Sequence, residues 1–87
     1  MSFNTDQIAI STSAVLIIAA NAIRENLQIK NTGTDTVFIG SNSSVTASNG
    51  FPVEAGEKLN INDYSGDYYG ICNTGDSSTM MFVEEDV

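Results

Sequence analysis

The sequence predicts a small all-β protein: an antiparallel β-sandwich or barrel of about seven to eight short strands. Three observations predict this fold class. Thr, Ser, Val, Ile, Asn and Gly dominate the 87 residues, while Leu, Glu, Lys and Arg are scarce, a composition that suits strands and turns. Apolar and polar residues alternate with a period of two in short runs. Turn-forming residues separate these runs at short intervals, as in antiparallel sandwiches.

Seven runs show this alternation, and each is expected to be a strand. They are QIAIST (7–12), AVLIIAA (14–20), NLQIKN (26–31), TVFIG (36–40), KLNIN (58–62), DYYGICN (67–73) and TMMFVEE (79–85). In six of these runs, alternate residues share one face, which is expected to be the inner face. These residues are Ile8, Ile10 and Thr12; Leu27 and Ile29; Val37 and Ile39; Leu59 and Ile61; Tyr69 and Ile71; and Met80 and Phe82. The segment 51–53 is expected as an edge or irregular strand, because Pro52 has no amide hydrogen.

Turn chemistry predicts how the strands are joined. Residues 31–35 should close a hairpin, with Gly33 available for a positive φ angle. Residues 55–57 are expected to form a tight turn, and residues 73–76 are expected to form a second hairpin. Residues 21–26 are expected to hold one helical turn at a corner of the sandwich.

Residues 1–87 are expected to form a single domain, with residues 1–6 as an N-terminal arm and residues 84–87 as an acidic tail. A core of this size is marginal. With one cysteine, Cys72, and no histidine, neither an internal disulfide nor a zinc site is expected. The runs 14–20 and 79–83 are apolar on both faces, so either another copy of the chain or covering loops should shield the outer face.

The formal net charge of −8 excludes partners that are recognised through a basic patch. Nucleic acid and anionic membranes are therefore not expected as partners. The charge either keeps a small protein soluble or favours a basic protein surface. The longest apolar run is too short to span a bilayer and lacks the flanks of a signal peptide, so the chain is expected in the cytoplasm where it is made.

No arrangement of residues predicts catalysis, a metal or a cofactor. A nucleophile needs a base, which is usually histidine, and the chain has none. Cys72 has no basic neighbour in sequence and is expected to be a small apolar group, buried or at an interface. Asp63 and Asp67 lack the calcium-loop pattern and indicate a solvated turn. A tyrosine cluster (Tyr64, Tyr68 and Tyr69) fits a sugar-stacking surface, a protein contact or ordinary packing with Tyr69 inside and Tyr68 outside.

The order of these pieces resembles a small β-sandwich module of tailed-bacteriophage virions. The matching pieces run from an arginine, through N-x-G and a strand ending in glycine, to a Gly-Phe-Pro-Val step and an Ala-Gly turn. They fall on Arg24, on Asn31 and Gly33, and on the ranges 37–40, 50–53 and 55–56. Some members of this family resemble head decoration, or cement, proteins, which sit as trimers on the capsid and clamp neighbouring major capsid subunits. Similar modules occur in head fibres and tail-associated proteins.

The resemblance implies a capsid decoration protein without enzymatic activity or cofactor, with the major capsid protein and its own copies, as a homotrimer, for partners. It implies a place on the outer capsid surface of the virion, after synthesis in the host cytoplasm. The alternative is a carbohydrate- or receptor-binding module of a head fibre or tail structure. The residues expected to contact other copies or the capsid are Phe3, Tyr64, Tyr68, Cys72, Met81 and Val83.

Overall fold

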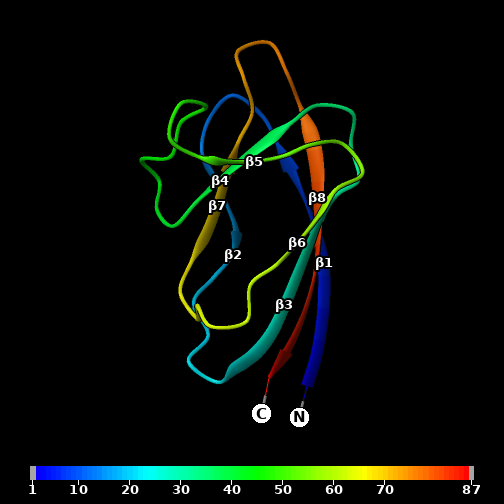
Figure 1. Cartoon of the computed structure of the whole chain (residues 1–87), viewed down its shortest axis with the longest axis vertical. Helices are drawn as coiled ribbons and strands as arrows, with labels where there is room; N and C mark the ends of the chain where they lie inside the picture. Colours follow the sequence, from blue (N-terminus) through cyan, green and yellow to red (C-terminus); the bar gives the residue numbers. More distant parts are fainter. Residues whose placement is uncertain (1, 87) are drawn as a thin grey trace.

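Eight β-strands form the structure, a computed structural model that describes residues 2–86 (Figure 1). Between residues 2 and 86 no segment is helical. The strands are β1 (Ser2–Ile10), β2 (Val15–Ile18), β3 (Arg24–Asn31), β4 (Val37–Gly40), β5 (Phe51–Val53), β6 (Lys58–Asn60), β7 (Tyr68–Ile71) and β8 (Ser78–Asp86). The helical turn expected at residues 21–26 is wrong: Asn21 opens a tight turn, and β3 already begins at Arg24.

The strands form two antiparallel sheets of four. Sheet A has the order β1-β8-β3-β6, and sheet B has the order β2-β7-β4-β5. The first strand pairs with the last, the second with the seventh, the third with the sixth and the fourth with the fifth. A long run of paired strands wrapped in this way around one core is the eight-stranded jelly roll. The predicted all-β sandwich is therefore confirmed.

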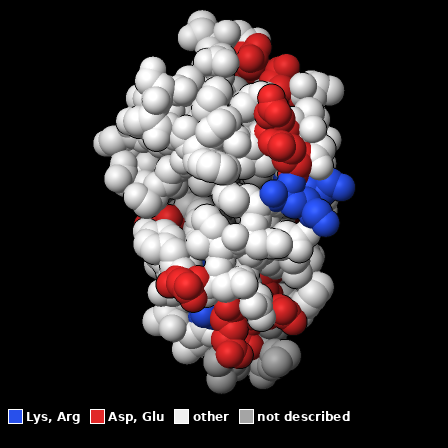
Figure 2. All heavy atoms as spheres, in the orientation of Figure 1, with Lys and Arg blue, Asp and Glu red and all other residues white. Residues whose placement is uncertain are grey.

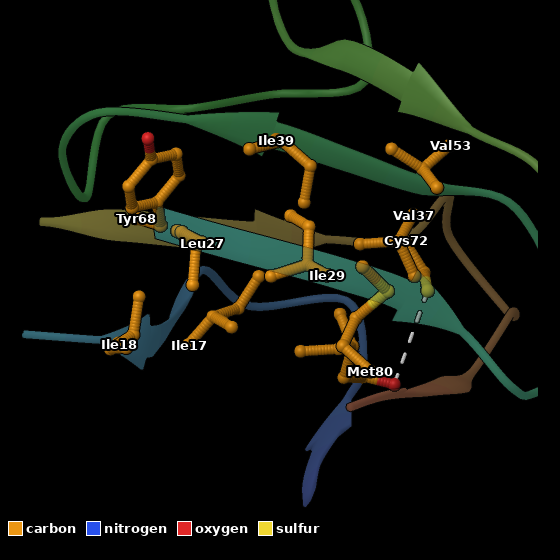
Figure 3. Packing of buried hydrophobic residues seen from close by; sticks show 11 residues of the cluster. Ile17, Ile18, Leu27, Ile29, Val37, Ile39, Val53, Tyr68, Cys72 and Met80 are labelled. Carbon is orange, nitrogen blue, oxygen red and sulfur yellow. Dashed lines mark hydrogen bonds between the residues drawn. The ribbon is translucent and has the colours of Figure 1, made fainter. Parts of the chain in front are cut away.

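The core lies between the sheets and consists mainly of the alternate residues of each strand (Figure 3). Its buried members are Ile10, Ile17, Ile18, Leu27, Ile29, Val37, Ile39, Val53, Tyr68, Cys72 and Met80. The inward positions predicted for the second half of β3 and for β4 are confirmed, and Leu59 and Ile61 pack half-buried against the same core. Burial of these side chains is the main favourable contribution to folding.

Both predicted hairpins are wrong, because six of the seven connections cross from one sheet to the other. The exception joins β4 to β5. The segment 31–35 instead carries the chain from β3 in sheet A to β4 in sheet B, and the segment 73–76 carries it back from β7 to β8. Gly33 does not have a positive φ angle; Gly56 and Gly75 do. An added Cβ at Gly33 would lie 2.6 Å from the backbone nitrogen of Thr79, so this glycine permits close packing against β8.

The predicted phase of β7 is also wrong. Tyr68, Gly70 and Cys72 face the core, and Tyr69 and Ile71 face outward. The cause is at Gly70, where an added Cβ would lie 2.9 Å from Ile17 and 3.0 Å from Val37. Since the core has no room for a side chain at this point, the glycine and its alternate neighbours face inward.

The two ends of the chain belong to the sheet rather than to an arm and a tail. Residues 2–6, expected as part of an N-terminal arm, pair with β8 from the register Ser2 with Asp86 onward. Residues 84–86, expected as part of an acidic tail, are the end of β8, which lies between β1 and β3 and pairs with both. Residues 1 and 87 lie outside the described residues. The alternation of β8 turns Glu84 inward, where it is buried.

Candidate binding surfaces

A groove of about 410 Å³ opens between the free edges of the two sheets, where β5 ends sheet B and β6 ends sheet A. Strands β5 and β6 have only three residues each, too few to close the sandwich along this side. The groove is lined by Ile39, Gly40, Ser41, Phe51, Leu59, Ile61, Tyr64 and Tyr68. Six of these eight residues are apolar or aromatic, so the groove favours contact with apolar surface and offers few hydrogen bonds.

Two aromatic side chains at this groove reach solvent. Phe51 is 60% exposed and Tyr64 is 42% exposed, values that are high for such large apolar groups. Figure 2 shows acidic side chains along one side and at the lower end of the molecule, a basic patch on that side between them, and a broad uncharged area over the rest of the upper face. An uncharged surface with exposed aromatic rings is typical of the centre of a protein contact.

Tyr64 and Tyr68 lie together but differ in exposure. Their rings meet edge to face with centroids 5.3 Å apart, and the Tyr68 hydroxyl donates a hydrogen bond to the Tyr64 carbonyl oxygen at 3.3 Å. Tyr68 is buried, and burial raises its pKa above the ordinary value of 10.0, although the nearby Arg24 acts in the opposite direction. Tyr68 therefore supports Tyr64 from below, and Tyr64 presents the accessible ring.

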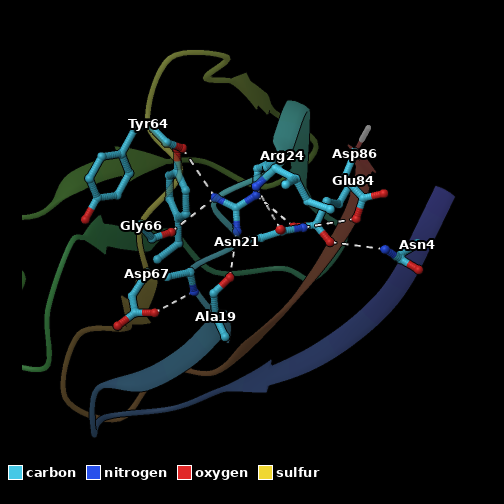
Figure 4. Close-up of polar contacts among 12 residues, drawn as sticks. Asn4, Ala19, Asn21, Arg24, Tyr64, Gly66, Asp67, Glu84 and Asp86 are labelled. Atoms are coloured by element: carbon cyan, nitrogen blue, oxygen red, sulfur yellow. Dashed lines mark hydrogen bonds and ion pairs between the residues drawn. The ribbon is translucent and has the colours of Figure 1, made fainter. Parts of the chain in front are cut away.

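A buried arginine holds the segment that carries Tyr64 (Figure 4). The Arg24 Nε donates to Glu84 Oε2 at 2.8 Å, in an ion pair whose two side chains are almost inaccessible. The other guanidinium nitrogens donate to the carbonyl oxygens of Tyr64, Gly66 and Ala19. These bonds connect both sheets with the loop between β6 and β7, so they fix where Tyr64 stands at the groove.

Further polar contacts surround this ion pair. Asn4 donates to Glu84 Oε1 at 3.2 Å, and Asn21 donates to Asp86 at 3.1 Å. Asp67 accepts a hydrogen bond from the Ala20 backbone N–H at 2.7 Å. This bond holds the turn that contains Asp63 and Asp67. Across residues 3–86 no buried side-chain nitrogen or oxygen lacks a hydrogen-bond partner. The network is therefore satisfied internally, as a structural network must be.

Phe3, Met81 and Val83 lie on the outer face of sheet A. Phe3 is opposite Glu85 in the β1–β8 ladder, while Val83 and Met81 occupy the next two outward positions of β8. Phe3 is 67% exposed and Met81 is 41% exposed, so no loop shields this side of the run 79–83. The rest of the face is polar, with Gln28, Lys30, Lys58 and Asn60 on β3 and β6.

Cys72 lies in the core, away from both surfaces. It is 3% exposed, and its sulfur lies 3.9 Å from the carbonyl oxygen of Ile10. Burial raises the pKa of the thiol, and the charges of Asp35 and Asp76 act in the same direction. The thiol is therefore held in its unreactive protonated form. The six predicted contact residues thus occupy three places: Tyr64 and Tyr68 at the groove, Phe3, Met81 and Val83 on sheet A, and Cys72 inside.

The described part of the chain contains no cluster of three or more Cys, Asp or Glu side chains that could hold a metal ion. It also contains no helix that is long and apolar enough to cross a membrane. No family model matches the sequence, and the searches of curated proteins and of solved structures found no significant match.

Two parts of this arrangement were not predicted from the sequence. The ion pair between Arg24 and Glu84 joins residues sixty positions apart, and Glu84 stands in a run of acids that indicated a tail. The signal that could have placed it was the alternation of Met80 and Phe82, which continues to Glu84 on the inner face. Phe51 was not singled out either, because a groove between two sheet edges depends on pairing that local sequence does not show.

Proposed function

We propose that the chain is a capsid decoration protein that binds the outer surface of a bacteriophage head and clamps neighbouring major capsid subunits. The observation that carries the proposal is the uncharged groove with the exposed rings of Phe51 and Tyr64, a surface suited to binding another protein. The homotrimer implied by the resemblance belongs to the same proposal.

The fold and the chemistry of the groove bear differently on the choice between the two candidate functions. The jelly roll recurs in viral capsid proteins, although it also occurs in lectin domains, so the fold favours both candidate functions to the same extent. The groove separates them better. Sugar recognition needs hydrogen bonds to hydroxyl groups as well as an aromatic face, and this groove is almost entirely apolar. Apolar contact between two folded surfaces is the better match.

A clamp of this kind works by mass action. A protein that binds the assembled lattice better than free subunits stabilises the lattice, by roughly 2.7 kcal/mol per site at a hundredfold excess over its dissociation constant. Repeated over many sites, this raises the barrier to separation of the subunits. Particles that lack the protein should therefore form with normal shape but release their genome at a lower temperature, and purified protein should restore them.

The test uses two exposed apolar residues as a matched pair. Phe51→Ser removes the ring at the groove, and Ile23→Ser removes a side chain of similar exposure, 53%, in the turn before β3. Loss of a central aromatic contact is expected to weaken binding to stripped heads roughly 30-fold, the effect of about 2 kcal/mol. Ile23→Ser should bind like the unmodified chain.

Three outcomes would contradict the proposal. Stripped heads that keep their genome as well as decorated heads would show that no clamp is needed. Equal binding of the two variants would remove the groove from the contact. Loss of host attachment alone, together with binding of the protein to a glycan array, would favour the carbohydrate- or receptor-binding alternative, with Tyr64 as the exposed ring.

A further inference from the structure

The two sheets have four outer strands, and three of their free edges are protected against pairing with another chain. Strand β5 has three residues and contains Pro52, which donates no hydrogen bond. Strand β6 has three residues and begins with Lys58. Strand β2 has four residues and an irregular register between Leu16 and Ile18. Short length, proline, lysine and bulges are the features that keep edge strands from pairing.

Strand β1 has none of these features. It runs for nine residues with an unbroken register against β8, and it contains neither proline nor lysine. The side chains from Phe3 to Gln7 and that of Ala9 are exposed. Only Asp6 carries a charge in this strand. A long, regular edge with a single charge is a template for pairing with a further strand.

The backbone groups on this edge follow from the ladder. Thr32 donates to the Thr79 carbonyl oxygen, so the odd-numbered residues of β8 bond to β3 and the even-numbered ones bond to β1. Since Ser78 is opposite Ile10, the even-numbered residues of β1 also bond within the sheet. The N–H and C=O groups of the odd-numbered residues 3–9 therefore point to the free edge.

From this edge we infer that two copies of the chain pair through their β1 strands, antiparallel, about a two-fold axis at Thr5. In this register Thr5 is opposite Thr5 of the second copy, and Phe3 is opposite Gln7 of the second copy. All of these are odd-numbered positions, so both strands offer hydrogen-bonding groups at the same places. The two A sheets become one sheet of eight strands.

The charge at Asp6 disfavours the two registers whose axis lies further along β1, at Asp6 or at Gln7. An axis at Asp6 would place the two carboxylates directly opposite each other, and like charges in that position are destabilising. An axis at Gln7 would place Asp6 opposite the apolar Ile8. The axis at Thr5 places Asp6 opposite Asn4, whose amide can donate to the carboxylate.

Asp6 already lies along this edge. Its Oδ1 accepts a hydrogen bond from the Gln7 N–H at 2.8 Å. In the pair, that N–H turns to the carbonyl oxygen of Phe3 in the second copy, and the carboxylate takes the Asn4 amide instead. The Asp6 carboxylate and the Gln7 N–H therefore each keep a hydrogen-bond partner, and the second copy covers the free edge of β1. The pair does not depend on the proposed function, and as a two-fold contact it adds to a three-fold contact made by another surface.

The test places one thiol on the strand, in the full chain. Thr5→Cys puts two thiols near the axis, with Cα atoms about 5.5 Å apart. Ala9→Cys is the matched control, because Ala9 lies on the same edge and is also exposed. Its two copies would lie about 27 Å apart along the strands. The buried Cys72 is common to both variants. A short thiol-to-thiol crosslinker should join two chains of Thr5→Cys and leave Ala9→Cys single.

A second pair of variants separates pairing from folding. Gln7→Pro, added to Thr5→Cys, removes an N–H that points to the free edge and leaves the bonds to β8 in place, so it should lower the crosslinking rate at least about tenfold. Gln7→Ala should not. No crosslink in Thr5→Cys, or equal crosslinking at residue 9, would overturn the pair. The Gln7→Pro chain should still bind stripped heads, so loss of the pair and loss of the proposed function can be told apart.

Discussion

Asn31 is fully buried, and its side chain makes four hydrogen bonds. The amide nitrogen donates to the carbonyl oxygens of Asp35 and Val53, both at 2.8 Å. The amide oxygen accepts from the Gly33 N–H at 3.0 Å and from the Ser78 hydroxyl at 2.6 Å. One side chain thus joins the end of β3 with the crossing loop, with β5 and with β8, and stabilises the chain where it crosses from sheet A to sheet B.

Asn31→Asp should destabilise the fold strongly. The new carboxylate would face two carbonyl oxygens that have lost their donor, and a buried charge without compensation is costly. The free energy of unfolding, measured by urea denaturation, should fall by about 3 kcal/mol or more. Asn60→Asp, on the exposed outer face of β6, should change it by less than about 0.5 kcal/mol. Equal effects of the two substitutions would show that the four bonds do not stabilise the corner.

Cys72 predicts how stability depends on alkaline pH. Its pKa is raised in the folded chain above the ordinary value of 9.0, so the folded state holds this proton more tightly than the unfolded state. The contribution is complete below pH 9 and is lost as pH rises further, because only the unfolded chain then releases the proton. Thermal denaturation between pH 8 and pH 10 should show this loss, and Cys72→Ala should show less of it.

At neutral pH, Cys72→Ala should lower stability by about 1 kcal/mol through lost packing. The same site also predicts slow reaction with thiol reagents in the folded protein. If the stability of Cys72→Ala falls with rising pH as steeply as that of the unmodified chain, other groups cause the alkaline loss. Tyr68, whose pKa is also raised, would then be the first candidate.

At the scale of elements, β8 organises sheet A. It is paired on both sides along its length, and its last three residues complete the ladder with β1 and β3. Two adjacent glutamates at this end have opposite orientations: Glu84 faces inward to Arg24, and Glu85 faces outward, near Asn26. The same residue type therefore has two different roles, set by the period of the strand.

Glu84→Gln should lower the free energy of unfolding by about 3 kcal/mol, because it removes one charge of the buried ion pair with Arg24. Glu85→Gln, which makes the same chemical change one position later, should have an effect below about 0.5 kcal/mol. Chemical denaturation of both variants at neutral pH gives the comparison. If the residues acted together as a solvated acidic tail, both substitutions would be nearly neutral.

At the scale of the whole molecule, the net charge of −8 acts against every contact between copies. The radius of gyration is 12.0 Å, smaller than the Debye length of about 30 Å at 0.01 M salt, so two copies repel through their whole charge at low ionic strength. At 0.15 M salt the Debye length is about 8 Å, and the repulsion is largely screened.

Self-association should therefore tighten as salt rises from about 0.01 M to about 0.15 M. Sedimentation velocity at a series of protein concentrations measures this directly. Binding to a basic capsid surface should respond in the opposite way, with slower association at higher salt. Self-association that weakens with salt would indicate that opposite charges, rather than backbone pairing and apolar contact, hold the copies together.

The sequence by itself determined the fold class and most of the inner face. Alternation in β3 placed Leu27 and Ile29 correctly, because each has a polar residue on both sides. The predicted phase of β4, with Val37 and Ile39 inside, was also correct. The tight turn at residues 55–57 was also predicted, since it depends on local chemistry: the Glu57 N–H bonds to the Glu54 carbonyl oxygen, and Gly56 takes a positive φ angle.

Tertiary structure decided the rest. In β7 every candidate position is apolar or aromatic, so the period gives two equivalent phases, and only the lack of space beside Gly70 selects one. Whether two neighbouring strands form a hairpin or cross between sheets depends on pairing between distant segments, as does the groove beside Phe51. The acidic end became a strand because β1 and β3 lie on either side of it and Arg24 offers a buried partner, and neither condition can be seen within residues 84–87.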